Sequence, residues 1–193
     1  MSSIAIFVSG SGTNCENIIR WFAGRSDVRV ALVVSNRPDA YALVRAGRHG
    51  VPTAVLTRRQ INDPAVILPL LESYDISLIV LAGFMLMIPS FLVDSYPRRI
   101  INIHPSLLPR HGGKGMYGHH VHQAVKDAGD TVSGITVHYV SDVCDGGEII
   151  AQFSTPVSPD DTPDDIERKV RALEIRRYPE VIEQVINQVN GER

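Results

Sequence analysis

The early part of the chain alternates short apolar runs, rich in β-branched residues, with segments of helical periodicity. The apolar runs occupy residues 4–8, 28–34, 53–56, 78–82 and 100–103. Helical patterns follow the first four of them, around residues 18–22, 41–49, 65–74 and 91–95. A strand that leads through a helix into another strand of the same sheet normally crosses over and pairs in parallel. We therefore expect an α/β fold with five parallel strands.

The later part of the chain changes this pattern. A helix is expected over residues 119–126, followed by strands over residues 133–140 and 148–153. Only residues 141–147 join these two strands. Because a parallel crossover needs a dozen or more residues, the two strands must return as an antiparallel hairpin.

The last stretch, residues 162–189, has the pattern of a helix. Thr162 can cap its start, and the two acids that follow Pro163 favour the positive end of the helix dipole. Pro179 lacks an N–H group, so we expect it to divide the helix. Since no repeat or linker interrupts the chain, residues 1–193 are predicted to form one domain. Its sheet is Rossmann-like, mixed and mostly parallel, with a late antiparallel hairpin and a C-terminal helix.

Charge and composition exclude several classes of protein. Nineteen Lys and Arg against twenty-one Asp and Glu give a formal charge of −2, without the positive excess that nucleic-acid backbones attract. The uncharged run over residues 76–93 is broken by Pro89, so it indicates a buried strand rather than a membrane helix. Residues 1–8 lack the basic segment and long apolar run of a signal peptide, so none is expected, and two distant cysteines, Cys15 and Cys144, fit a reducing compartment. We expect a cytoplasmic protein that acts on small molecules.

A glycine-rich loop, residues 9–14 (SGSGTN), stands between the first strand and the first helix. Exposed N–H groups and the helix dipole make such a position an anion site, and a phosphate group fits it. A dinucleotide fingerprint would need glycine in place of Cys15 and an acid near Arg37. A Gly-Lys-Ser or Gly-Lys-Thr phosphate motif is also missing from the sequence. The alternative is a tight turn that only uses glycine's backbone freedom.

Two polar patches follow in the later part. Asn102 and His104 alternate on one face at the carboxyl end of a predicted strand, where open α/β sheets have their active crevice. They either hydrogen-bond internally or face that crevice. Asp145 precedes Gly146 and Gly147 in the hairpin loop, where it is either a turn residue or a carboxylate placed beside the imidazole of His104. No metal site is predicted, because the clustered histidines lack the spacing of a zinc motif.

Four segments together resemble the phosphoribosylglycinamide formyltransferase family, folate-dependent enzymes of purine synthesis. They are residues 9–14, the LAGFM segment at 81–85, the NIHPSLLP segment at 102–109 and the DVCDGG segment at 142–147. The likeness covers nearly the whole chain. It implies transfer of a formyl group from the co-substrate 10-formyltetrahydrofolate to the amine of glycinamide ribonucleotide, with no metal. The N-terminal half would bind phosphate, and the C-terminal half would bind folate and carry the catalytic groups.

The resemblance also implies roles for individual residues. The catalytic positions are Asn102, His104 and Asp145. The phosphoribosyl-binding positions are Gly10, Ser11, Gly12, Thr13, Asn14, Arg171 and Glu174. The folate-binding positions are Met85, Leu86, Met87, Ile88, Asn102, Val140, Ser141 and Asp145. The chain departs from the family at Leu86, where many members have a basic residue, and in a longer loop at residues 110–117.

The expected chemistry is direct attack of the amine on the formyl carbon through a tetrahedral intermediate. The Asn102 amide would stabilise its oxygen, and His104 with Asp145 would move the proton. Cys144 is not expected to act as a nucleophile, because nothing near it in the sequence marks it as activated. The alternatives are a formyltetrahydrofolate deformylase, a methionyl-tRNA formyltransferase and a non-catalytic binding module. Whether the protein is a monomer or a homodimer stays open.

Overall fold

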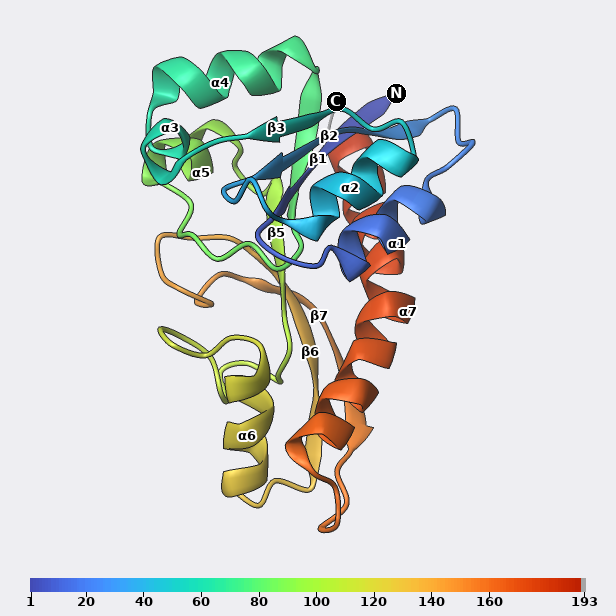
Figure 1. Ribbon diagram of the computed structural model, residues 1–193, viewed down its shortest axis with the longest axis vertical. Coiled ribbons are helices and arrows are strands. Elements are labelled where there is room, and N and C mark those ends of the chain that lie inside the picture. Colours follow the sequence, from blue (N-terminus) through green and yellow to red (C-terminus); the bar gives the residue numbers. More distant parts are fainter. Residues whose placement is uncertain (192–193) are drawn as a thin grey trace.

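The computed structural model describes residues 1–191 and contains one seven-stranded mixed sheet (Figure 1). The strands are β1 (Ser2–Val8), β2 (Val28–Ser35), β3 (Thr53–Val55), β4 (Ile76–Leu81), β5 (Ile100–His104), β6 (Val132–Tyr139) and β7 (Ile149–Pro156). Their order is β3-β2-β1-β4-β5-β6-β7. The first five strands are parallel, and β6 and β7 return antiparallel. The predicted fold class is confirmed.

The helices divide between the two faces of the sheet. They are α1 (Thr13–Trp21), α2 (Tyr41–Arg48), α3 (Arg58–Ile61), α4 (Pro64–Ser73), α5 (Ser90–Ser95), α6 (His119–Asp127) and α7 (Pro163–Gly191). Side chains alternate along β1: Ile4 and Ile6 pack in the core under α1, α2, α6 and α7, whereas Ala5 and Phe7 pack in the core under α3, α4 and α5. The central strands are therefore buried on both faces, which explains their unbroken apolar sequence.

Helix α7 is continuous, so the prediction that Pro179 divides it was wrong. Proline cannot bond to the carbonyl of Ile175 one turn earlier. The side-chain amide of Asn17, on α1, donates to that carbonyl instead, with an Nδ2–O distance of 2.6 Å. The start of the helix agrees with the sequence, because the Thr162 hydroxyl accepts from the backbone N–H of Asp165.

Helix α3 was not predicted. Its four residues are too few for a hydrophobic repeat, and the helix depends on a local capping box. Thr57 accepts from the backbone N–H of Gln60, while the Gln60 side chain accepts from the backbone N–H of Thr57.

The strand order places a crevice at one end of the sheet. The chain moves outward from β1 through β2 to β3, then crosses to β4 on the other side of β1. The loops after β1 and β4 therefore leave in opposite directions and open a space at the carboxyl ends of these strands. Separately, among residues 1–191, no helix combines the length and the apolar character that crossing a bilayer requires.

Candidate active site

A cavity of about 860 Å³ lies at the carboxyl ends of β1, β4 and β5, between the β6–β7 loop and α7. It is lined by all the site residues predicted from the sequence. These are Gly10, Ser11, Gly12, Thr13, Asn14, Met85, Leu86, Met87, Ile88, Asn102, His104, Val140, Ser141, Asp145, Arg171 and Glu174. Residues from five separate segments of the chain thus surround one space.

Two carbonyls of the glycine loop accept hydrogen bonds from helix α2. The backbone N–H of Ala42 donates to the Gly10 carbonyl at 3.1 Å, and Arg45 donates through Nε to the Ser11 carbonyl at 3.0 Å. Gly12 has a φ of 77° and lies against α2, so that a Cβ on it would be 2.4 Å from the Cβ of Ala42. Only glycine fits there. The first N–H groups of α1 have no intrahelical partner, and together with the helix dipole they form an anion site.

Asn14 connects this loop to α7. Its Nδ2 donates to Oε2 of Glu174 at 3.0 Å, and its own Oδ1 is buried without a hydrogen-bond partner. Burial raises the pKa of the Glu174 carboxyl, and the bond from Asn14 partly offsets that rise. Arg171, one turn earlier on α7, is about half exposed and pairs with Glu167 at 3.1 Å. A cation, an acid and an amide therefore lie at the edge of the anion site.

Ser9 links the glycine loop to the segment after β4. Its backbone N–H donates to the Gly83 carbonyl at 3.0 Å, and its hydroxyl accepts from the backbone N–H of Met85 at 2.9 Å. The hydroxyl in turn donates to Oδ1 of Asn36 at 2.6 Å. Beyond Ser9, Met85 and Met87 are exposed at the cavity, whereas Leu86 and Ile88 pack into the core. Two loops at neighbouring strand ends are thus joined by one buried side chain.

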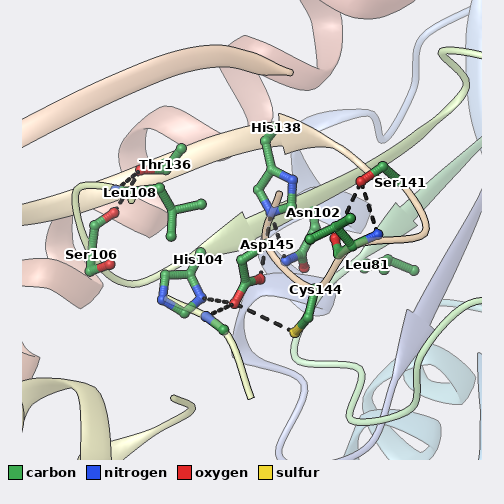
Figure 2. Close-up of polar contacts among 12 residues, drawn as sticks. Leu81, Asn102, His104, Ser106, Leu108, Thr136, His138, Ser141, Cys144 and Asp145 are labelled. Carbon is green, nitrogen blue, oxygen red and sulfur yellow. Dashed lines mark hydrogen bonds and ion pairs between the residues drawn. The ribbon is translucent and has the colours of Figure 1, made fainter. Parts of the chain in front are cut away.

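The polar cluster at the end of β5 includes a residue that sequence reasoning missed, His138 (Figure 2). Antiparallel pairing places His138 of β6 opposite Asn102 of β5. Nδ1 of His138 lies 2.9 Å from the Tyr139 carbonyl, to which it can only donate. Burial lowers the pKa of His138, which favours the neutral ring. Nε2 then accepts from Nδ2 of Asn102 at 3.2 Å, and this contact orients the Asn102 amide.

Asp145 brings the cluster together from the β6–β7 loop (Figure 2). Oδ2 of Asp145 lies 3.5 Å from Nδ1 of His104, and Oδ1 lies 3.8 Å from Nε2 of His138. The backbone N–H of Gly113 donates to Oδ2 at 2.9 Å. Nε2 of His104 meets the carbonyl of His111 at 2.8 Å. Both nitrogens of His104 therefore face oxygen atoms, one on Asp145 and one on His111.

Cys144 lies beside Asp145, with Sγ 3.8 Å from Oδ2. Burial and then the neighbouring carboxylate raise the pKa of the Cys144 thiol above its usual value. The thiolate is the nucleophilic form of cysteine, so this environment works against covalent chemistry at Cys144.

The clustered histidines have different surroundings. His122 is buried and lines the cavity, whereas His119 and His120 are exposed on α6. The ring of His119 lies beside Asp164 and Glu167, and these three residues could bring ligand atoms within 4.8 Å of one another. His119 and Asp164 are exposed, whereas Glu167 is half-buried and also lines the cavity.

Pairing and loop geometry explain what sequence reasoning missed at this site. The missed contacts are the ring of His138, the carbonyl of His111 and the N–H of Gly113. The alternation of Thr136 and His138 along β6 indicates that both lie on one face of the strand. Only the β5–β6 register shows that this face meets Asn102 and His104. The two backbone groups leave no signal in the side-chain pattern.

Comparison with known proteins places this geometry in a family. Residues 2–182 match the formyl transferase family model. A phosphoribosylglycinamide formyltransferase from Haemophilus influenzae is 38% identical over 187 residues, covering 94% of this chain and 86% of that protein. The Bacillus subtilis protein of the same name is 37% identical over the full length of both chains. This chain spans 63% of the length of a chloroplastic protein of that name from Arabidopsis thaliana, also 38% identical.

Solved structures agree with the sequence relatives. The crystal structure of phosphoribosylglycinamide formyltransferase from Anaplasma phagocytophilum superimposes with a TM-score of 0.88 at 33% identity, over 96% of this chain and 87% of that one. Glycinamide ribonucleotide transformylase 1 from Symbiobacterium toebii gives a TM-score of 0.87 at 36% identity, over 97% of this chain and 89% of that one. Since the family model covers most of the sequence and the fold agrees, the chain belongs to the formyl transferase family.

Proposed function

We propose that this protein transfers the formyl group of 10-formyltetrahydrofolate to the amine of glycinamide ribonucleotide, a step of purine biosynthesis. The observation that carries the proposal is the single cavity shared by the glycine loop and the cluster of Asn102, His104 and Asp145. The names of the relatives supply the substrates. We further propose that the protein works in the cytoplasm on these small molecules alone.

The ribonucleotide would lie at the glycine-loop end of the cavity. The N–H groups of Gly12, Thr13 and Asn14 would bind its phosphate, and the charge of Arg171, which lines the same cavity, would add to their attraction. Glu174 offers an acceptor for ribose hydroxyls. The unpartnered Oδ1 of Asn14 offers a second acceptor at the same place.

The folate would lie at the other end of the cavity, between the segment after β4 and the β6–β7 loop. Residues 85–88 supply apolar surface on one side, and Val140, Ser141 and Asp145 line the other side. Each binding region then draws on both halves of the chain, because residues 85–88 come from the first half and Arg171 and Glu174 from the second.

The reaction would proceed by direct attack. The amine nitrogen bonds to the formyl carbon, and the resulting adduct carries negative charge on its oxygen. One N–H of the Asn102 amide is held by His138, which leaves the other to donate to that oxygen. The bond from the formyl carbon to N10 of the folate then breaks. The proton lost by the amine passes through His104 and Asp145 to N10, so the products are the formylated ribonucleotide and tetrahydrofolate.

No enzyme-bound formyl intermediate is needed. The formyl donor is already activated, and holding both reactants in one cavity removes much of the entropic barrier. Cys144 is therefore not assigned a role in the transfer.

The test is an absorbance assay with 10-formyl-5,8-dideazafolate in the presence and absence of glycinamide ribonucleotide. We expect release of the deformylated folate only when the ribonucleotide is present, with one formylated ribonucleotide formed for each folate released, as counted by mass spectrometry. Release without acceptor would indicate a deformylase, and binding without release would indicate a non-catalytic module. Either result contradicts the proposal.

A further inference from the structure

Behind the catalytic cluster, one buried carboxylate holds the loop that contacts both His104 and Asp145. Asp130 lies between α6 and β6, and its side chain is only 7% exposed. Its Oδ2 accepts from Nε2 of His111 at 2.7 Å, and its Oδ1 pairs with the guanidinium of Arg110. Two consecutive loop residues therefore share one acceptor.

Asp130 itself has a fixed place in the fold. Its backbone N–H donates to the carbonyl of Val125 in the last turn of α6, at 3.2 Å, and β6 begins two residues later. The carboxylate thus connects the loop after β5 to regular structure that lies outside the cavity.

The backbone around His111 supplies two contacts to the cluster. The His111 carbonyl accepts from Nε2 of His104 at 2.8 Å. Two residues later, the N–H of Gly113 donates to Oδ2 of Asp145 at 2.9 Å. The position of this short segment therefore decides where both reactive groups are held.

The start of this loop has a few local bonds: the Ser106 hydroxyl donates to the Arg110 carbonyl at 2.7 Å, and the Arg110 N–H donates to the Leu107 carbonyl at 3.1 Å. Residues 110–118 contain four glycines and no helix or strand. His111 has a φ of 52°, a conformation that a residue with a Cβ keeps only when its surroundings impose it. The contact between the imidazole of His111 and Asp130 is a tertiary interaction of the kind that such a conformation requires.

We propose that His111 is a positioning residue, whose imidazole bond to Asp130 holds the His111 carbonyl against Nε2 of His104. The imidazole of His104 is thereby oriented with Nδ1 toward Asp145. The expected effect on turnover rests on the proposed formyl transfer, whereas the orientation of His104 can be measured without it.

The variant His111→Gly tests this directly. Glycine adopts a positive φ freely, so the substitution removes the imidazole without adding backbone strain. Asp130→Asn is a second variant that keeps the size of the side chain and removes its charge. Arg110→Ala is the matched control, because it removes the other partner of Asp130. The Arg110 side chain is 62% exposed.

Two measurements are made on each folded variant, with thermal unfolding as the check of folding. The first is kcat and the KM of both substrates in the formyl transfer assay. The second is the imidazole N–H signal of His104 in the NMR spectrum of the ligand-free protein, identified by its loss in His104→Gln. For His111→Gly we expect kcat to fall about 100-fold, with both KM values changed by less than about threefold. The His104 signal should be lost through exchange with water. Asp130→Asn should show both effects more weakly, and Arg110→Ala should show neither.

The proposal is overturned if His111→Gly keeps the His104 signal, whatever happens to kcat. It is also overturned if the signal is lost and kcat stays within about threefold of the wild type, since positioning would then not matter for the reaction. Should the wild-type protein transfer no formyl group, the proposed function fails, and the NMR comparison alone decides whether His111 positions His104.

Discussion

The two ends of the cavity are built from different parts of the polypeptide. The glycine-loop end is lined by five consecutive residues, Gly10 to Asn14, which lead into the start of α1 and are bonded to α2. The other end, which we propose is the catalytic end, presents side chains from β5, β6 and the β6–β7 loop, which meet only when the sheet has formed. A backbone site depends on main-chain conformation and tolerates change in most side chains. A side-chain site depends on the identity of each group.

The largest expected effect is at the catalytic end, in Asn102→Asp. This substitution replaces an N–H donor by a carboxylate that faces both the developing oxyanion and the acceptor nitrogen of His138. Loss of the donor alone, in Asn102→Ala, should lower kcat by about 10²- to 10³-fold, and the aspartate variant should be lower still. Steady-state kinetics measures both variants, and folate binding by calorimetry serves as the control for folding. An aspartate variant more active than the alanine variant would show that Asn102 does not stabilise the oxyanion.

The second prediction is that His104 and Asp145 act as one unit. Each of His104→Ala and Asp145→Asn should lower kcat by at least about 10²-fold, because either change stops the proton relay. The kcat of the double variant should lie within about tenfold of the kcat of the less active single variant, since the second change removes nothing further. A double-mutant cycle on kcat measures this. Losses that multiply would mean that the two groups act independently.

At the glycine-loop end, Gly12→Ala is expected to weaken binding rather than chemistry. Its methyl group would meet Ala42 and displace the loop, so the KM for the ribonucleotide should rise at least about tenfold with little change for the folate. Gly24→Ala is the matched control, because Gly24 has a similar φ of 76° but nothing within 4 Å of an added Cβ. Both variants should lose about 1 kcal/mol or more of stability in urea unfolding, from the positive φ alone. Equal KM changes in the two variants would contradict a local role for Gly12.

The smallest expected effect is in Cys144→Ser. Because the pKa of this thiol is raised, the thiol is a poor nucleophile, and its removal should change kcat by less than about twofold. Kinetics with both substrates measures this. A serine variant without turnover would contradict the direct-transfer mechanism and would add Cys144 to the side chains that the reaction needs.

The same contrast explains which features could be predicted from the sequence. The parallel sheet and the hairpin follow from local periodicity and loop length, which neighbouring residues determine. The continuity of α7 does not, because the group that compensates for Pro179 is the Asn17 amide, on a helix near the other end of the chain. Helix α3 was missed because it depends on a cap rather than on a hydrophobic repeat.

The candidate site divides in the same way. The glycine loop is contiguous, and Asn102 and His104 share one strand, so their alternation could place them on one face. The proximity of Asp145 to His104 remained one of two interpretations until a family resemblance favoured it. His138 and the carbonyl of His111 depend on strand register and on loop conformation, which no local pattern specifies.

The bonds of Ser9 have a consequence for substrate range. Because its N–H and hydroxyl connect the loop after β1 to the loop after β4, the spacing between acceptor and donor is set in the folded protein before either arrives. Under the proposed function, a longer or shorter acceptor could not be accommodated by altering one loop alone. Selection for a new acceptor should therefore change residues on both sides of Ser9 together, or replace Ser9 itself.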